Sequence, residues 1–502
     1  MTGVLSEPHT VTRRRENLVL AAVSVCTVLV VGFVAAINLA VPMLAASALH
    51  PDSSQLLWIV DAYVVVFACL VIPGGAFGDR FGRKGTLLTG LVVFALGAVV
   101  SALSTGLPVM LSGRVLSGLG AALVLPNCVG VLVHATRPER RRGALALWGA
   151  ISGIGGVLGN TGGAALLSTG RWQTLFWGVV PFALVCVAAI AALAGTSPRT
   201  FRRLDPAGTL LLVATSVVLL VGIIEAPEVG WDSALVLGAF VLAGVLAVVW
   251  VLVELRVEHP VLDPRLFRGR LLAGASLGML VTWFGSFGLF YLNASLLQYG
   301  RGFPVLLAGL ATLPLAGPIL LGTRFLPRLV TRVGVPLILG GGFLAICTGL
   351  VGLSFATRQS FGFYAFWLVV VGIGFALALP TLTSELTAGL PPEQAGVAGG
   401  LQSATRELGS ALGIAVVGTI AVVSFSAHLP LALQSLDPLP RTVASALSAA
   451  PWEHNGIIDA FVTGGSTALR IGAGITLVTG AIVVALISRP GNLARRASSS
   501  AS

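Results

Sequence analysis

The sequence contains few charged residues for its length. Asp, Glu, Lys and Arg make up 10% of its 502 residues, whereas 56% are hydrophobic. A soluble domain has about a quarter of its residues charged, and a smaller share leaves too little polar surface to cover a globule of this size. The composition therefore excludes a soluble globular protein, and the apolar content excludes a disordered chain.

Cysteine and histidine are also scarce, and neither is arranged for chemistry. The five Cys lie inside apolar runs without paired spacing, so we interpret them as core residues rather than disulfide or zinc ligands. The six His lie in or beside loops, so the GxSxG match at 274–278 has no base deep in a span. Since a P-loop is also absent, we expect no enzyme activity and no metal, nucleotide or other cofactor. Any pumping must use an ion gradient.

Positive charge exceeds negative charge, with 30 Lys and Arg against 19 Asp and Glu and a formal net charge of +11. Such an excess indicates nucleic-acid binding only when it gathers on one surface. Here the basic residues are scattered over short loops. We therefore expect no nucleic-acid partner, and we expect a lipid bilayer to surround the chain.

Long apolar runs are what the sequence has in abundance. A membrane-spanning helix needs about 20 predominantly apolar residues. The chain has fourteen runs near this length, so we predict an all-α polytopic membrane protein. The expected spans are 18–42, 56–77, 85–105, 109–133, 143–167, 173–195, 207–225, 233–255, 271–298, 304–327, 334–356, 361–386, 398–425 and 467–488.

The basic residues alternate between loops in a way that gives the orientation. Of the 30 Lys and Arg, 23 fall at the two ends of the chain or in the loops on the same side as these ends. An even number of spans puts both termini on the same side of the membrane. Because cytoplasmic loops are the basic ones, both termini are expected in the cytoplasm. The stretch 428–461 then lies outside as a long loop, with a short amphipathic helix expected at 443–449.

Five charged residues stand out within the expected spans, where an ionisable group costs about 2.5–3.5 kcal/mol and marks a candidate functional site. Asp61 and Arg114 each lie about 8 Å below the outer surface at 1.5 Å per residue, so the two side chains can pair. A structural interpretation has the pair joining two helices. A functional one has Asp61 carrying a proton, with Arg114 tuning its affinity.

The other three charges lie in the second half of the chain. Glu385 is near the cytoplasmic end of its span, from which its side chain can reach water. Arg406 and Glu407 are adjacent and point about 100° apart on a helix, so we expect each to have a separate partner and a structural role.

The fifth span is rich in glycine. Its glycines allow close approach of another helix, and they also allow it to act as a hinge. They are Gly149, Gly153, Gly155, Gly156, Gly159, Gly162 and Gly163.

The loop after the second span resembles the signature loop of the major facilitator superfamily, G-x-L-x-D-R-x-G-R-[RK]. The matching residues are Gly75, Gly78, Asp79, Arg80, Gly82, Arg83 and Lys84. The stretch around Arg114 resembles the fourth-helix motif of that family, whose Arg is linked to proton transfer. A further resemblance, to the fourteen-helix drug:proton antiporters, is found at Trp58, Asp61 and Tyr63 and in the segments 258–267 and 395–409.

This resemblance implies two six-helix bundles, at 1–200 and 263–502, with two inserted helices at 201–262 between them. It implies a substrate path near the midplane between the bundles, and Gly75–Lys84 as a conformational-switch loop. It also implies a monomer in the bacterial cytoplasmic membrane that exchanges protons for a small amphipathic substrate, as in drug or antibiotic efflux.

Two positions depart from the family pattern. Phe33 occupies the place of an Asp in the first helix, so Asp61 is the best remaining proton carrier of the first half. In the fifth helix Gly155, Gly159, Asn160, Gly162 and Gly163 stand where the family has G-P-x-x-G-G, and Asn160 replaces the Pro. The substrate, the stoichiometry and the coupling to protons stay open.

Aromatic residues of the ninth span suit flat compounds as the wall of a cavity, although such a stripe also suits lipid contact or core packing. The candidate cavity residues are Asn38, Tyr63, Trp283, Phe287, Tyr291 and Asn293. With few carboxylates in the spans, a neutral or weakly charged substrate fits better than a dication. An uptake permease or facilitator, and a membrane sensor with the same scaffold, remain alternatives.

Overall fold

The computed structural model describes residues 13–488, apart from 48, 50, 52, 196–204, 258–259, 261–263, 391–394 and 437–438. This part of the chain is helical and contains no β-strand. Fourteen of its helices are long and apolar enough to cross a membrane, which confirms the expected count. Six of the basic residues counted above, at 199–203 and 489–496, lie outside the described residues.

The first six long helices pack against one another. They are α1 (Arg13–Ala45), α2 (Ser53–Phe81), α3 (Arg83–Ala102), α4 (Leu107–Ala135), α5 (Pro138–Leu167) and α6 (Gln173–Leu193). The closest pairings are α3 with α4, α1 with α5 and α2 with α4. Helix α1 also contacts α6 and α4.

A second set of helices forms the other half of the molecule. It comprises α9 (Arg270–Ser295), α10 (Val305–Leu310), α11 (Leu313–Val333), α12 (Val335–Ala356), α13 (Phe361–Ala388), α14 (Ala395–Ala427) and α17 (His454–Ile487). The span expected at 304–327 is divided between α10 and α11 at Ala311 and Thr312. Pro314 in the first turn of α11 explains the break, because it lacks the N–H that a continuous helix would use.

Helices α7 (Pro206–Val229) and α8 (Ala234–Glu254) lie between these two sets in the sequence, and they pack on each other. Asp205 caps α7 by accepting a hydrogen bond from the Gly208 N–H at 2.9 Å. Helix α7 contacts both α2 and α14, one from each half. Most large apolar side chains of α8 are exposed, as expected of a helix that faces lipid.

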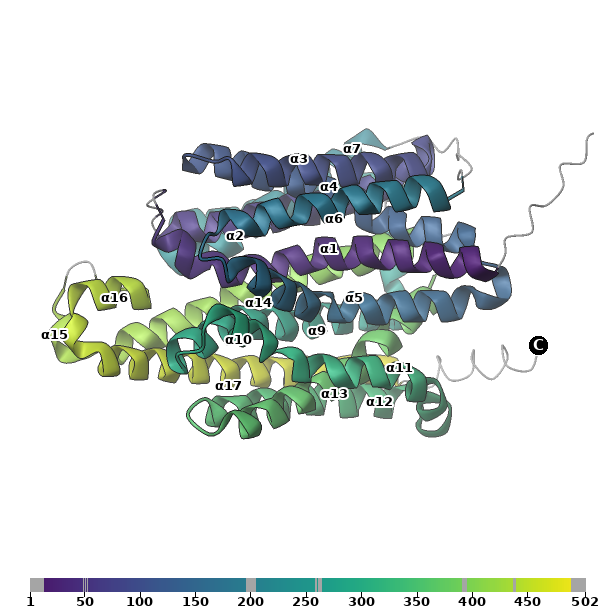
Figure 1. Ribbon diagram of the computed structural model, residues 1–502. Coiled ribbons are helices and arrows are strands. Elements are labelled where there is room, and N and C mark those ends of the chain that lie inside the picture. Colours follow the sequence, from purple (N-terminus) through teal and green to yellow (C-terminus); the bar gives the residue numbers. More distant parts are fainter. Residues whose placement is uncertain are drawn as a thin grey trace, which may run out of the picture.

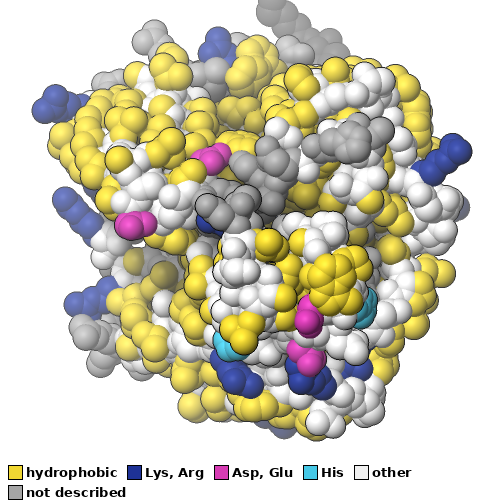
Figure 2. All heavy atoms as spheres, turned by 90° about the vertical axis from the view of Figure 1, so that its left-hand side faces the viewer, with side chains coloured by type: hydrophobic (Ala, Val, Ile, Leu, Met, Phe, Trp, Pro, Cys, Tyr) yellow, Lys and Arg dark blue, Asp and Glu magenta, His cyan; other side chains and the backbone are white. Residues whose placement is uncertain are grey.

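The two ends of the described chain lie at the same end of the molecule. Figure 1 shows α1 beginning and α17 ending there, with α15 (Leu431–Gln434) and α16 (Val443–Ala449) at the opposite end. The basic-loop pattern predicts that the first of these ends is cytoplasmic and the opposite end is outside, and the two ends are named accordingly below. The outer end, which faces the viewer in Figure 2, carries few charged side chains among many apolar ones.

The outer segment contains more helix than expected. Helix α16 forms at 443–449 as predicted, and a capping box between Thr442 and Ser445 starts it. Helix α17, however, begins at His454 rather than near 467, so the last part of the expected loop is helical. A buried cluster that includes Phe425, Leu433 and Ile457 packs the outer segment onto the ends of α14 and α17.

Candidate functional site

Arg114, in the middle of the first set of helices, is fully buried on α4 with an exposed fraction of 0%. Its Nε donates to the Ile59 carbonyl at 2.8 Å and its Nη2 to the Val60 carbonyl at 3.1 Å. Both acceptors belong to α2, just before Asp61. The guanidinium therefore joins α4 to α2 through the backbone, and its Nη1 has no hydrogen-bond partner in the described structure.

Two aromatic rings flank this guanidinium. The Arg114 Cζ lies 5.0 Å from the centre of the Phe33 ring and 4.9 Å from that of Tyr63. Distances of this size are typical of cation–π contacts. Phe33 thus contacts the arginine at the position where the resemblance has a carboxylate. The Tyr63 hydroxyl donates to the Val30 carbonyl at 3.2 Å, which joins α2 to α1 as well.

Asp61 is buried on α2, directly after Val60, whose carbonyl accepts a hydrogen bond from Arg114. The described ion pairs within 4.0 Å, however, do not include an Asp61–Arg114 pair. The expected direct pairing is therefore absent from this conformation. The reason is that the guanidinium is held by the carbonyls of Ile59 and Val60, which leaves Asp61 as a buried carboxyl beside a cation.

The second-half charges are arranged differently from the expectation. Arg406 and Glu407 were expected to have separate partners, but Arg406 Nε donates to Glu407 Oε1 at 2.7 Å, so that prediction is wrong. The two side chains leave the helix about 100° apart, but the arginine side chain is long enough to bend back to the adjacent glutamate. The Arg406 Cζ also lies 5.3 Å from the Phe67 ring of α2 and 5.9 Å from the Trp283 ring of α9.

Glu385, near the cytoplasmic end of α13, does not extend into water. The side chain is buried in the structure, although the sequence placed it within reach of the surface. The expected solvent contact is therefore wrong for this conformation, because Glu385 lies on the buried face of α13, beside Leu382 and Leu386.

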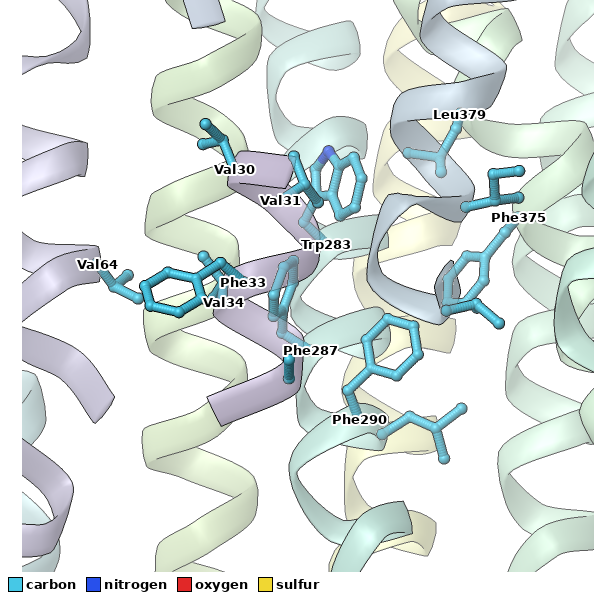
Figure 3. Close-up of a cluster of buried hydrophobic side chains, with 14 of the residues drawn as sticks. Val30, Val31, Phe33, Val34, Val64, Trp283, Phe287, Phe290, Phe375 and Leu379 are labelled. Atoms are coloured by element: carbon cyan, nitrogen blue, oxygen red, sulfur yellow. The ribbon is translucent and has the colours of Figure 1, made fainter. Parts of the chain in front are cut away.

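The aromatic stripe of α9 lies inside the molecule, between the two sets of helices. Figure 3 shows Trp283 and Phe287 beside the α1 segment that carries Val31 and Val34. Phe290 lies against α5, where a Cβ added to Gly156 would meet its ring at 3.0 Å. Among the alternatives for this stripe, the structure therefore excludes lipid contact and places it at the interface of the two halves.

The candidate cavity residues with amide and hydroxyl groups have different contacts. Asn293 on α9 accepts a hydrogen bond from the Tyr364 hydroxyl at 2.6 Å, and the pair is buried in the second half. Asn38 on α1 is buried, with its amide N–H groups on the Val34 and Ala35 carbonyls and its Oδ1 unpartnered in the described structure. Tyr291 packs its ring beside Gly418 of α14.

The glycines of α5 let this helix approach α1 at backbone distance. A Cβ added to Gly32 would lie 2.8 Å from the Gly159 Cα, and one added to Gly163 would clash with the Cβ of Ala36. Gly155 packs on Val31 in the same crossing. By contrast, Gly162 faces open space. Helix α5 runs unbroken from Pro138 to Leu167, as expected from the absence of the family's proline.

Asn160 is buried on α5, and its side-chain Oδ1 has no hydrogen-bond partner in the described structure. Its backbone carbonyl lies near Gly309 of α10, so this part of α5 packs against the other half of the molecule. The substitution of Pro by Asn therefore adds a polar group at the contact between the halves.

The signature loop joins four helices at the cytoplasmic end. Gly82 separates α2 from α3 with a φ of 104°, a conformation that favours glycine. Asp79 and Arg83 form an ion pair at 2.6 Å across this turn. The Lys84 Nζ donates to the Ala191 and Ala194 carbonyls at 2.8 and 2.7 Å, where α6 ends.

Three other residues of this loop have structural contacts. Arg80 lies over the Phe81 ring at 5.5 Å, Gly75 packs near Pro126 of α4, and a side chain at Gly78 would clash with Asn127. The loop is thus packed closely onto α4.

Sequence reasoning missed several polar contacts between helices. Trp58 Nε1 donates to Glu225 Oε1 at 2.7 Å, which joins α2 to the inserted α7. Glu16 near the start of α1 is buried and pairs with Arg137 and Arg140 at the cytoplasmic start of α5. Glu16 follows three arginines in the sequence, so a buried acid there had no local signal. Within the described residues, no group of His, Cys, Asp and Glu could hold a metal ion.

Comparison with known proteins points to one family. The sequence profile of the Major Facilitator Superfamily matches residues 23–414. The chain is 30% identical to multidrug resistance protein Stp of Mycobacterium tuberculosis over 84% of this chain and 79% of that protein. It is 29% identical to the tetracenomycin C resistance and export protein of Streptomyces glaucescens, over 96% of this chain and 94% of the relative.

A solved structure has the same fold. The crystal structure of a bacterial homologue of the human lysosomal transporter Spinster, in an inward-facing and unoccupied conformation, superposes with a TM-score of 0.65. It shares 15% sequence identity and covers 95% of this chain and 97% of its own. Together with the fourteen spans and the matched profile, this likeness confirms the expected all-helical transporter fold. The chain belongs to the Major Facilitator Superfamily, as a multi-pass membrane transporter rather than an enzyme.

Proposed function

We propose that this protein exports amphipathic small molecules across the bacterial cytoplasmic membrane in exchange for protons. The observation that carries the proposal is Asp61, a carboxyl buried on α2 directly after the two residues whose carbonyls bind Arg114, with which it forms no direct ion pair in the described structure. The named relatives support it, because they are a multidrug resistance protein and an antibiotic resistance and export protein.

In this proposal Asp61 takes up a proton from outside and releases it inside. A carboxyl that is buried without a tight salt bridge can exist in both protonation states, whereas a direct pair with Arg114 would hold it ionised. Arg114 is held by the α2 carbonyls of Ile59 and Val60. A small shift of α4 against α2 would move the guanidinium toward or away from Asp61, and this would couple the proton to helix movement.

The moving units would be the bundles of residues 1–200 and 263–502, with 201–262 as an insertion. Helices of both bundles meet where α9 packs beside α1 and α14 beside α2. The substrate would pass through this interface, and the loop Gly75–Lys84 would control its cytoplasmic opening. The protein would work as a monomer, with the proton gradient as its energy source and without a cofactor.

Inverted membrane vesicles with a pH-sensitive dye test the proposal. Adding a transported compound is expected to dissipate the proton gradient with the unmodified protein and not with Asp61→Asn. Glu254→Gln is the matched control, because Glu254 is a buried carboxyl on α8, away from Arg114. Equal dissipation by the unmodified protein and the Asp61→Asn variant would exclude Asp61 as the carrier.

A facilitator or uptake permease of the same fold is the second candidate. Phe33 favours it, because the ring occupies the position of a family carboxylate and contacts Arg114. Transport of a compound down its own gradient, with no proton response for any compound, would favour this alternative.

A further inference from the structure

A groove with apolar walls runs along the first set of helices. It has a volume of about 460 Å³, and its lining comes from residues 25–36 of α1, 158–166 of α5 and 175–182 of α6. Figure 1 shows α1 between the other two helices, and α1 contacts both of them. The groove is therefore formed by one half of the molecule alone.

Glycines create the space in this groove. Gly32 and Gly159 bring α1 and α5 together at backbone distance, because a Cβ added to Gly32 would lie 2.8 Å from the Gly159 Cα. Gly162 also lines the groove, and a Cβ added there would meet no atom within 4 Å. The close crossing and the missing side chain at Gly162 together leave a space that α6 does not fill.

The groove opens toward the lipid. Val25, Leu158 and Phe182 line it, and these side chains are between 40% and 55% exposed within the expected spans. The lining residues are all apolar or glycine, so they offer no side-chain hydrogen bond to water, and a cavity of this kind stays dry. If the groove were empty, its walls would lose dispersion contacts. Hydrocarbon is therefore the occupant that fits.

The length of the groove matches one layer of lipid chains. Residues 25–36 extend along α1 for about 16 Å at 1.5 Å per residue. Each leaflet contributes about half of the roughly 30 Å hydrocarbon core, or about 15 Å. The α5 and α6 parts of the lining lie next to the turn 168–172, which joins these two helices at the outer end. The groove thus suits a single acyl chain of the outer leaflet.

Arg171 supplies a positive charge at the outer end of the groove. The Thr174 Oγ1 lies 2.7 Å from the carbonyl oxygen of Leu166, which lines the groove, and 2.6 Å from that of Arg171. The Arg171 side chain is exposed, and it makes no hydrogen bond or ion pair with the described residues. By contrast, Arg358 at the same end pairs with Asp459 at 2.8 Å. Arg171 is therefore available to an anion from outside the protein.

We propose that the groove binds one acyl chain of an anionic phospholipid of the outer leaflet, with the headgroup phosphate beside Arg171. The chain would lie against Phe33, which lines the groove and whose ring contacts Arg114. A net-negative headgroup such as that of phosphatidylglycerol is preferred, because the choline cation of phosphatidylcholine offsets the phosphate charge. This lipid site goes beyond the export function and does not depend on it.

Photolabelling in a bilayer tests the site. The full-length protein is reconstituted in phosphatidylcholine nanodiscs that contain a trace of either phosphatidylglycerol or phosphatidylcholine with a diazirine in one acyl chain. After illumination, mass spectrometry of the peptides measures the labelling of the three groove segments relative to that of α8, whose exposed apolar side chains report random lipid contact. We expect groove labelling above the α8 level with both lipids. Labelling with phosphatidylglycerol should be roughly fivefold stronger, as expected for one cation near an anionic headgroup.

Two variants that fill the groove test the position of the acyl chain. Gly162→Leu and Ala165→Phe add side chains at lining positions on α5, and each should lower the labelling by both lipids to the α8 level. Gly474→Leu is the matched control, because Gly474 is exposed on α17 and an added Cβ there also meets no atom within 4 Å. It should leave the groove labelling unchanged.

Arg171→Gln tests the headgroup contact. It should reduce the phosphatidylglycerol labelling to the phosphatidylcholine level, whereas Arg358→Gln should not, because Arg358 is already paired with Asp459. Inorganic phosphate supplies the charge without a chain. Compared with chloride at equal ionic strength, it should leave the labelling unchanged. Thermal unfolding in detergent checks that each variant is folded.

Groove labelling no stronger than that of α8, or unchanged labelling in both filled variants, would overturn the acyl-chain site. Equal labelling by the two lipids, or an unchanged preference in Arg171→Gln, would overturn the headgroup assignment. Displacement by inorganic phosphate would also overturn the proposal, because it would show an anion site without a chain. The measurement involves neither transport nor a proton gradient, so its outcome is independent of the vesicle assay.

Discussion

The guanidinium carbon of Arg114 lies 5.0 Å from the centre of the Phe33 ring, where the family pattern has an aspartate. The ring replaces an ion pair by a cation–π contact, which is worth about 2 kcal/mol when desolvated. Phe33 also makes edge contacts with the rings of Tyr63, Phe94 and Phe176. The first helix thus stabilises the buried cation without adding a titratable group.

We expect Phe33→Leu to destabilise the protein more than Phe94→Leu. Both residues are buried, and both changes remove a ring of the same size, but only Phe33 faces the Arg114 charge. The difference should be about 1–2 kcal/mol, seen as a lower midpoint of thermal unfolding in detergent. An equal or larger loss for Phe94→Leu would mean that the arginine gains nothing from the Phe33 ring.

Gly159→Ala should disrupt the crossing of α1 and α5. The added methyl group would clash with the backbone of Gly32, so the helices would have to separate, at a cost of about 1–3 kcal/mol. Gly162→Ala is the control three residues further along the same helix, where the new methyl group has nothing within 4 Å. Folded protein recovered from membranes should fall for the first variant and stay unchanged for the second, and equal recovery would contradict the packing role.

The buried Arg406–Glu407 pair should be sensitive to the loss of one member only. Arg406→Met leaves the Glu407 carboxylate buried alone and should cost about 3–5 kcal/mol. Changing both residues to Met should restore most of that stability, because the isolated charge is gone. Thermal unfolding of the unmodified protein and the two variants measures the difference, and a double variant as unstable as the single one would show that the pair itself supplies the stability.

The Trp58–Glu225 hydrogen bond should couple α2 to the inserted α7. Trp58→Phe and Glu225→Gln each weaken the 2.7 Å contact, and a double-mutant cycle should give a coupling of about 1–2 kcal/mol because the acceptor is charged. The cycle compares the midpoints of thermal unfolding of the unmodified protein, the two single variants and the double variant. Additive losses would mean that this hydrogen bond does not help to hold α7 against α2.

Sequence reasoning predicted the fold better than the contacts of individual side chains. Span number and orientation follow from hydropathy and loop charge, which are local quantities. The helix at 443–449 could be predicted for the same reason, because its apolar spacing and the Thr442 cap lie within one short segment.

The contacts that could not be predicted depend on rotamers and on neighbours distant in the chain. The adjacent Arg406 and Glu407 pair because the arginine side chain is long enough to bend back. Arg114 bonds to carbonyls of α2 rather than to Asp61, which depends on the rotation of α4 against α2. Sequence spacing gives the depth of these residues in the membrane but not this rotation.

The Arg406 guanidinium belongs to α14 in one half, and the Phe67 ring on which it lies, 5.3 Å away, belongs to α2 in the other. A contact of this kind is worth about 0.5–2 kcal/mol and has no strict geometry, unlike a hydrogen-bonded salt bridge. Thermal motion can therefore break it in every cycle and remake it afterwards. Because Glu407 neutralises the arginine from within its own helix, α14 can leave the ring without exposing an unpaired charge to the interface.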